Sequence, residues 1–124
     1  MDRLKVFLSY DYKLDEDLKD KVIEASEKLN SFEVYNSTIN TNLDTDYKLL
    51  VGKRIRECDL VIFLCGENTK NCLSQAAEMS ISREEGKDYV LIKRNEKATK
   101  PLNSRPYDIF YELSSLEGLI KGLR

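Results

Sequence analysis

Apolar residues along this chain fall into two kinds of segment, which alternate from one end to the other. The first kind is a short continuous run, such as Val6-Phe7-Leu8 or LVIFLC at residues 60–65, and it has the length of a β-strand. In the second kind, apolar residues recur every three or four positions, as on the inner face of an amphipathic helix. Because strands alternate with helices, we expect a parallel sheet with helices on both faces.

The same pattern gives approximate bounds for each element. Strands are predicted at 4–8, 32–35, 60–65 and 89–92. Helices are predicted from a cap at Asp15 to Asn30, from a cap at Asp44 or Thr45 to about 57, from 73 to near 86, and from 109 to 123. The polar segments 36–46 and 94–106 have no periodicity and are predicted to be loops.

The run LVIFLC at residues 60–65 is apolar at every position, which is typical of a strand buried on both faces. We therefore place it at the centre of the sheet. The predicted fold class is α/β, a flavodoxin-like three-layer sandwich with a four- to five-stranded parallel sheet in a single domain.

Composition narrows the classes of function. The formal net charge is −2, and Lys and Arg are spread along the 124 residues, so nucleic acid is not an expected partner. No apolar stretch approaches the roughly 18 residues that a membrane span needs. The apolar core of the N-terminal MDRLKVFLSYDY is too short for a signal peptide. We therefore expect a cytoplasmic protein that begins at Met1 and has no membrane partner.

The inventory of reactive side chains is short. The chain has no histidine, which excludes Ser-His-Asp and Cys-His catalysis. The three cysteines, Cys58, Cys65 and Cys72, form no CxxC pair, so we predict neither a zinc site nor a disulfide framework. The two common glycine-rich phosphate loops are absent as well. A carboxylate is therefore the side chain best suited to chemistry near neutral pH.

Polar residues gather at the carboxyl ends of the predicted strands, where open α/β sheets bind ligands. These clusters are Ser9-Tyr10-Asp11, Tyr35-Asn36, Gly66-Glu67-Asn68-Thr69 and Lys93-Arg94-Asn95. Surface loops are polar in any case, so the clusters are equally consistent with ordinary solvation. The first and third of them are the stronger candidates for function.

Glu78 lies two turns into the helix that follows the central strand. The apolar stripe of that helix centres near Leu73, Ala77 and Ser80, so periodicity places Glu78 on the helix flank, with Ser74 one turn earlier on the same side. Periodicity alone favours a solvated acid. Its position behind the strand ends favours a functional one, and both interpretations stay open at this point.

Two stretches, KVFLSYDY and VGKRIRECDLVIFLCGENTKNCLSQAAEM, resemble the TIR-like family. In particular they resemble its short prokaryotic branch, which includes the TIR-like sensor of the Thoeris antiphage system. The resemblance covers roughly residues 4–95, and the order of the motifs is more specific than any one motif. Residues that match family motifs are, in chain order, Ser9, Tyr10, Tyr12, Arg54, Ile55, Cys58, Asp59, Gly66, Asn68, Thr69 and, at the family's catalytic glutamate, Glu78.

The chain also departs from the family pattern at four positions. Cys72 stands where serine is usual, and Asp11 stands in place of a histidine. Ser74 and Ala77 stand where the family carries two tryptophans. These departures affect the packing of a substrate and leave the glutamate in place.

The resemblance implies a single TIR-like domain, residues 1–124, that cleaves the nicotinamide–ribose bond of NAD without a cofactor. Nicotinamide is a cationic leaving group, so a carboxylate that stabilises the oxocarbenium-like ribose is sufficient. Glu78 is the implied catalytic residue. The implied substrate-binding residues are Ser9, Tyr10, Asp11, Tyr12, Asn68, Thr69 and Ser74.

The family also implies a product and partners. The expected product is an ADP-ribose-derived signal nucleotide, cyclic in many relatives, that switches on a downstream effector in antiphage defence. A weak homo-oligomer is expected, because small TIR-like domains work by self-association.

Two other functions stay open on the sequence. A nucleoside deoxyribosyltransferase has a related fold and uses a glutamate near the third strand as a covalent nucleophile. A non-catalytic TIR-like interaction module is favoured by the two missing tryptophans.

Overall fold

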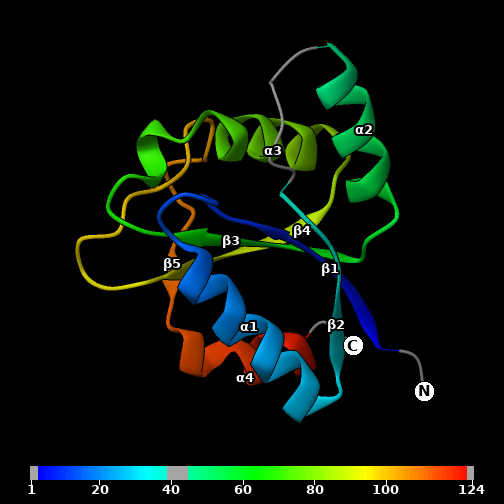
Figure 1. The fold of residues 1–124 in the computed structure, drawn as a ribbon, viewed down its shortest axis with the longest axis vertical. Helices are drawn as coiled ribbons and strands as arrows, with labels where there is room; N and C mark the ends of the chain where they lie inside the picture. The colour runs from blue at the N-terminus through cyan, green and yellow to red at the C-terminus, as the bar shows by residue number, and fades with distance from the viewer. Residues whose placement is uncertain (1–2, 39–44, 123–124) are drawn as a thin grey trace.

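The computed structural model describes residues 3–38 and 45–122, and it contains a five-stranded parallel sheet in the order β2-β1-β3-β4-β5 (Figure 1). The strands are β1 (Leu4–Ser9), β2 (Phe32–Ser37), β3 (Leu60–Cys65), β4 (Asp88–Lys93) and β5 (Phe110–Tyr111). This order is that of flavodoxin-like folds, and it confirms the predicted α/β class. It also confirms that residues 60–65 form the central strand.

In the part of the chain that the structure describes, four helices cover the two faces of the sheet (Figure 1). Helices α1 (Glu16–Leu29) and α4 (Leu116–Gly122) lie on one face, while α2 (Thr45–Arg56) and α3 (Leu73–Glu84) lie on the other. Two short 3₁₀ helices, Thr69–Asn71 and Leu113–Ser115, precede α3 and α4.

The central strand supplies both layers of the core. Leu60, Ile62 and Leu64 pack in the cluster under α1 and α4, whereas Val61 and Phe63 pack in the cluster under α2 and α3. Successive side chains of a strand point to opposite faces, so a strand between two helical layers must be apolar throughout. All six residues of β3 are indeed buried.

The carboxy-terminal segment differs from the sequence prediction. A helix was expected from Ile109, but Phe110 and Tyr111 form an edge strand that pairs with Leu91 and Ile92 of β4. Helix α4 begins only at Leu116, and the Ile109 side chain is exposed. The pairing with β4 is a tertiary contact, so it overrides the local helical spacing. The last residue of the predicted stripe, Leu123, lies outside the described residues.

The helix termini follow the prediction only in part. Asn30 ends α1 in the left-handed conformation, with φ 53°, which confirms the predicted end of that helix. Asp15 precedes α1, but its side chain makes no capping hydrogen bond. Its carboxylate is bound instead by the Arg94 guanidinium. Of the two predicted caps of the next helix, Asp44 lies outside the described residues, and Thr45 is the first residue of α2.

Candidate functional site

Glu78 is a buried residue, with none of its surface exposed to solvent. The interpretation of Glu78 as a solvated acid on the helix flank is therefore wrong. The buried face of α3 is largely polar, and its members are Ser74, Gln75, Ala76, Glu78, Met79, Ile81 and Ser82. By contrast, Leu73 is 65% exposed. Helical periodicity assumes that the buried residues of a helix are apolar. For that reason it did not predict that Glu78 lies on the buried face of α3.

Three hydroxyl groups donate hydrogen bonds to the Glu78 carboxylate. Ser9 Oγ and Thr38 Oγ1 lie 2.6 and 2.8 Å from Oε1, and Tyr47 Oη lies 2.7 Å from Oε2. These donors come from the end of β1, the residue after β2 and the first turn of α2. The carboxylate therefore joins segments that are far apart in sequence at the carboxyl ends of the strands.

The electrostatics of this site are unusual for a carboxylate. Burial raises the pKa of Glu78 to about 7, although the hydrogen bonds from Ser9, Tyr47 and Thr38 act to lower it. The described residues contain no cation paired with Glu78. Burial, together with the charge of Glu78, raises the pKa of Tyr47, so this phenol stays protonated and can donate its hydrogen bond. Glu78 therefore changes its charge close to neutral pH.

The cluster around β1 contributes to the site through Ser9 and through the Tyr10 backbone. The Tyr10 amide donates to Thr38 Oγ1 over 3.0 Å, and so holds one of the groups that bind Glu78. The Tyr10 ring packs on the α1 side of the sheet, opposite α3, with Lys19 Nζ 5.8 Å from its centre. Asp11 accepts from the Lys13 amide in a turn, and the half-buried Tyr12 ring lies near Lys13 Nζ.

The other predicted site residues make local contacts. Thr69 is buried, and its Oγ1 accepts from the Gly66 amide over 2.8 Å, which closes the loop after β3. Asn68 is exposed on the same loop. Ser74 Oγ lies 3.2 Å from Cys72 Sγ. Of the residues predicted to bind substrate, the structure therefore brings the Ser9 side chain into contact with the Glu78 carboxylate, which is itself covered.

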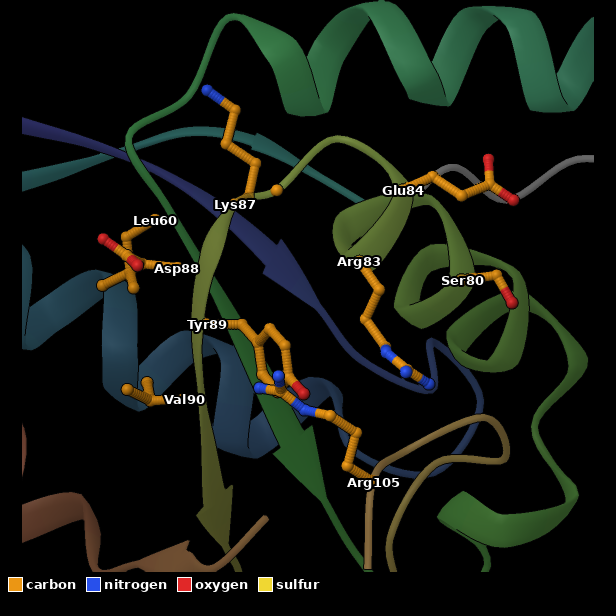
Figure 2. A pocket seen from close by; sticks show the side chains of 10 residues that line it. Leu60, Ser80, Arg83, Glu84, Lys87, Asp88, Tyr89, Val90 and Arg105 are labelled. Atoms are coloured by element: carbon orange, nitrogen blue, oxygen red, sulfur yellow. The ribbon is translucent and has the colours of Figure 1, made fainter. Parts of the chain in front are cut away.

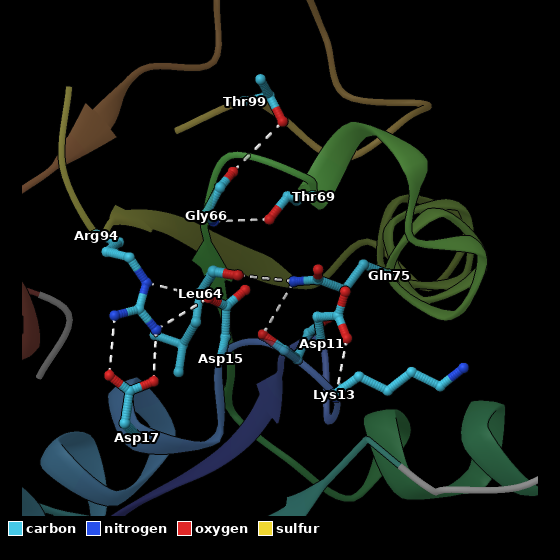
Figure 3. Close-up of polar contacts among 11 residues, drawn as sticks. Asp11, Lys13, Asp15, Asp17, Leu64, Gly66, Thr69, Gln75, Arg94 and Thr99 are labelled. Atoms are coloured by element: carbon cyan, nitrogen blue, oxygen red, sulfur yellow. Dashed lines mark hydrogen bonds and ion pairs between the residues drawn. The ribbon is translucent and has the colours of Figure 1, made fainter. Parts of the chain in front are cut away.

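Sequence reasoning missed three residues of the site: Thr38, Tyr47 and Gln75. Gln75 is fully buried one turn before Glu78, and its Nε2 donates to the carbonyls of Leu64 and Ser9 over 2.8 and 3.2 Å (Figure 3). This side chain ties α3 to the ends of β3 and β1 and so fixes the position of Glu78.

A second buried carboxylate, that of Asp15, lies at the same edge of the sheet (Figure 3). Arg94 binds Asp15 Oδ1 through Nε and Nη2, at 3.1 and 3.0 Å, and binds the carboxylate of Asp17 as well. A Cβ on Gly66 would stand 2.8 Å from Asp15 Oδ1, so glycine is required there by close packing. This cluster connects the start of α1 to the loops after β3 and β4.

Arg94 affects its two carboxylates differently. The hydrogen bond from Arg94 lowers the pKa of Asp17, which is exposed, to about 2. Burial raises the pKa of Asp15, while Arg94 acts in the opposite direction. Asp15 is thus a desolvated acid whose charge is matched by a guanidinium.

Within residues 3–38 and 45–122, no group of three or more Asp, Glu or Cys side chains could hold a metal ion. The helices in the same residues are too short or too polar to cross a membrane.

Comparison with known proteins adds no family assignment, since no protein-family model and no curated protein matches this chain. Membership of the TIR-like family therefore stays a prediction from the sequence motifs.

Proposed function

We propose that this protein is a TIR-like enzyme that cleaves the nicotinamide–ribose bond of NAD, with Glu78 as the catalytic residue. The observation that carries the proposal is a carboxylate buried behind the strand ends, which the described residues hold with three hydroxyl donors and no cation. A buried carboxylate without a countercharge stabilises a developing positive charge more strongly than a solvated one does.

The reaction needs one such group. The bond between ribose C1′ and the nicotinamide nitrogen breaks, and its electron pair moves to the nitrogen, which loses its positive charge. The positive charge that develops on C1′ is stabilised by Glu78. Water then bonds to C1′ and releases one proton, which gives ADP-ribose. Attack by a nitrogen or hydroxyl of the same molecule or of an acceptor gives a cyclic or conjugated signal instead.

The hydroxyl groups around Glu78 indicate how a ribose would be recognised. Ser9 and Thr38 present two O–H donors to the same carboxylate oxygen. In the proposed complex, the ribose 2′- and 3′-hydroxyls replace one or both of these donors, so each hydrogen bond lost to the protein is regained from substrate. Because Glu78 has no exposed surface, this exchange requires the covering hydroxyls to move apart when NAD binds.

The remaining predicted contacts form an outer part of this proposed site. Tyr12 offers an aromatic face, while Asp11, Asn68 and Thr69 offer polar groups in the segments after β1 and β3, and Ser74 offers a hydroxyl in the first turn of α3. In the proposal, the product is a signal nucleotide that acts on a downstream effector, and the active form is a weak homo-oligomer.

The test is NAD turnover by Glu78→Gln at high protein concentration, with the products identified by mass spectrometry. Glutamine keeps the shape and loses the charge, so we expect turnover to fall by roughly a hundredfold or more. The matched control is Glu24→Gln, which removes an exposed carboxylate paired with Lys28. Equal turnover by wild type and Glu78→Gln would contradict the proposal. Base exchange on deoxynucleosides, measured in parallel, tests the deoxyribosyltransferase alternative.

A second candidate function is a TIR-like interaction module without catalytic activity. The observation that favours it is the complete burial of Glu78, since the carboxylate is already satisfied by protein hydroxyls. In that case Glu78 holds β1, α2 and α3 together. Self-association by wild type, with no NAD loss at any protein concentration, is the result expected for this candidate.

A further inference from the structure

A second chemically distinctive region lies at the other end of α3. A pocket of about 790 Å³ opens beside the amino ends of β3 and β4, where Leu60 and Asp88 line it. This volume is in the range of pockets that hold small molecules. The pocket shares no lining residue with the Glu78 site, which lies at the carboxyl ends of the strands.

Two arginines reach into this pocket from different elements. Arg83 comes from the last turn of α3, and Arg105 comes from the loop between β4 and β5. Figure 2 shows both side chains in the space beside Tyr89, with Glu84 directed away from them. Ser80, one turn before Arg83, adds a hydroxyl to the lining.

Arg105 is fixed in place before any ligand arrives. Its guanidinium carbon lies 5.2 Å from the centre of the Tyr89 ring and 4.9 Å from that of Tyr107. Its Nε lies 3.4 Å from Asp108 Oδ1, and Tyr89 Oη donates to Oδ2 of the same carboxylate over 2.7 Å. Because this geometry is already established, little side-chain entropy is lost when the guanidinium binds a ligand.

Only some of the N–H donors of Arg83 form hydrogen bonds within the described residues. One of its terminal nitrogens donates to the Asn103 carbonyl over 2.9 Å, and within the described residues Arg83 forms no ion pair. A guanidinium has five N–H donors in a planar fork, which suits two oxygens of one anion.

The acidic residues near the pocket offset this charge only in part. Asp108 pairs with Arg105, whereas no carboxylate of the described residues pairs with Arg83. Asp88 lies on the opposite side of β4 from Tyr89, as Figure 2 shows and as strand alternation requires. The pocket lining contains three cations, Arg83, Lys87 and Arg105, and two carboxylates, Glu84 and Asp88.

We infer that this pocket is a binding site for a phosphorylated small molecule of nucleotide size, with Arg83 and Arg105 as the anchors of its phosphoryl groups. The site is distinct from the proposed NAD-cleaving centre, and it stands whether or not that centre is catalytic. The arginines supply charge-assisted hydrogen bonds, and the pocket volume leaves room for the rest of the ligand.

The test is a titration of the full chain with ADP and with adenosine, followed by amide NMR shifts. We expect ADP to bind saturably, with the largest shifts around Arg83, Tyr89 and Arg105, and adenosine to bind at least tenfold more weakly because it lacks the diphosphate. Arg83→Gln should weaken ADP binding at least tenfold. Arg83 is exposed and its substitution leaves the core intact, so folding does not obscure the result.

Two controls make the outcome decisive. Arg3→Gln removes an exposed arginine paired with Glu33, and it should bind ADP as wild type does. Glu78→Gln should also retain ADP binding, which separates this site from the proposed catalytic one. The inference is overturned if ADP does not saturate, if adenosine binds as tightly as ADP, or if Arg83→Gln binds as well as Arg3→Gln.

Discussion

Glu78 and Asp15 are two buried carboxylates at one edge of the same sheet, and the protein balances their charges in different ways. Asp15 is 4% exposed and lies against the Arg94 guanidinium, whereas Glu78 is fully buried and contacts hydroxyl groups from Ser9, Thr38 and Tyr47. A carboxylate paired with a guanidinium holds two segments of the fold together, and its charge is largely neutralised by its partner. An unmatched carboxylate keeps its charge available to a cationic species, at a cost in stability.

The largest expected effect comes from breaking the matched pair. Arg94→Gln leaves the Asp15 carboxylate buried without its cation, which typically costs roughly 3 kcal/mol or more in the free energy of unfolding. The loss should shrink at low pH, because protonation of Asp15 removes the unmatched charge. Urea unfolding at pH 8 and pH 4 measures both effects. The control Arg56→Gln, which breaks an exposed pair with Glu85, should change stability by less than about 1 kcal/mol.

The unmatched carboxylate should make stability depend on pH in the opposite sense to an ordinary acid. The pKa of Glu78 is about 7 in the folded protein, above its ordinary value of 4.5. Between these values the folded protein keeps a proton that the unfolded chain has lost. The contribution of Glu78 is therefore complete below pH 4.5 and is lost as pH rises through 7, for a total of roughly 3 kcal/mol.

Glu78→Gln isolates this contribution, because glutamine does not titrate. The difference in unfolding free energy between wild type and variant should change by roughly 3 kcal/mol between pH 4.5 and pH 8, in favour of the variant at the higher pH. Urea unfolding across this range gives the measurement. A difference that stays constant with pH would show that Glu78 titrates at its ordinary value.

Removing one hydroxyl donor should have a smaller effect with the same pH signature. Tyr47→Phe deletes the hydrogen bond to Glu78 Oε2, which is worth about 2 kcal/mol when the carboxylate is ionised. The loss should be larger at pH 8 than at pH 5. Tyr35→Phe, at a tyrosine that is 44% exposed, provides the control and should be nearly neutral at both values. An equal loss at both pH values would contradict the assigned partner.

The sequence was enough to predict the layered sheet, because β3 is apolar throughout and the helices carry apolar stripes at regular spacing. The edge strand Phe110–Tyr111 was missed, since only its pairing with β4 distinguishes it from the start of a helix. Local patterns carry no information on such tertiary contacts.

The candidate site was predictable in position and only partly in composition. Glu78 and Ser9 follow from their places at the strand ends. Thr38 and Tyr47 lie 40 and 31 residues away from Glu78, and nothing in a single sequence links a hydroxyl to a distant carboxylate. The polar character of the buried face of α3 was hidden for the same reason, because the partners of Gln75 and Glu78 lie on other elements of the fold.

The most direct test of the contrast between the two carboxylates is a titration of the Glu78 side chain, followed by NMR of its carboxyl carbon in the folded protein and assigned with Glu78→Gln. We predict a single midpoint near pH 7, because the carboxylate is fully buried and the described residues bind it through hydroxyl groups and supply no paired cation. A midpoint at or below 4.5 would contradict it, since Glu78 would then be either solvated or paired with a cation.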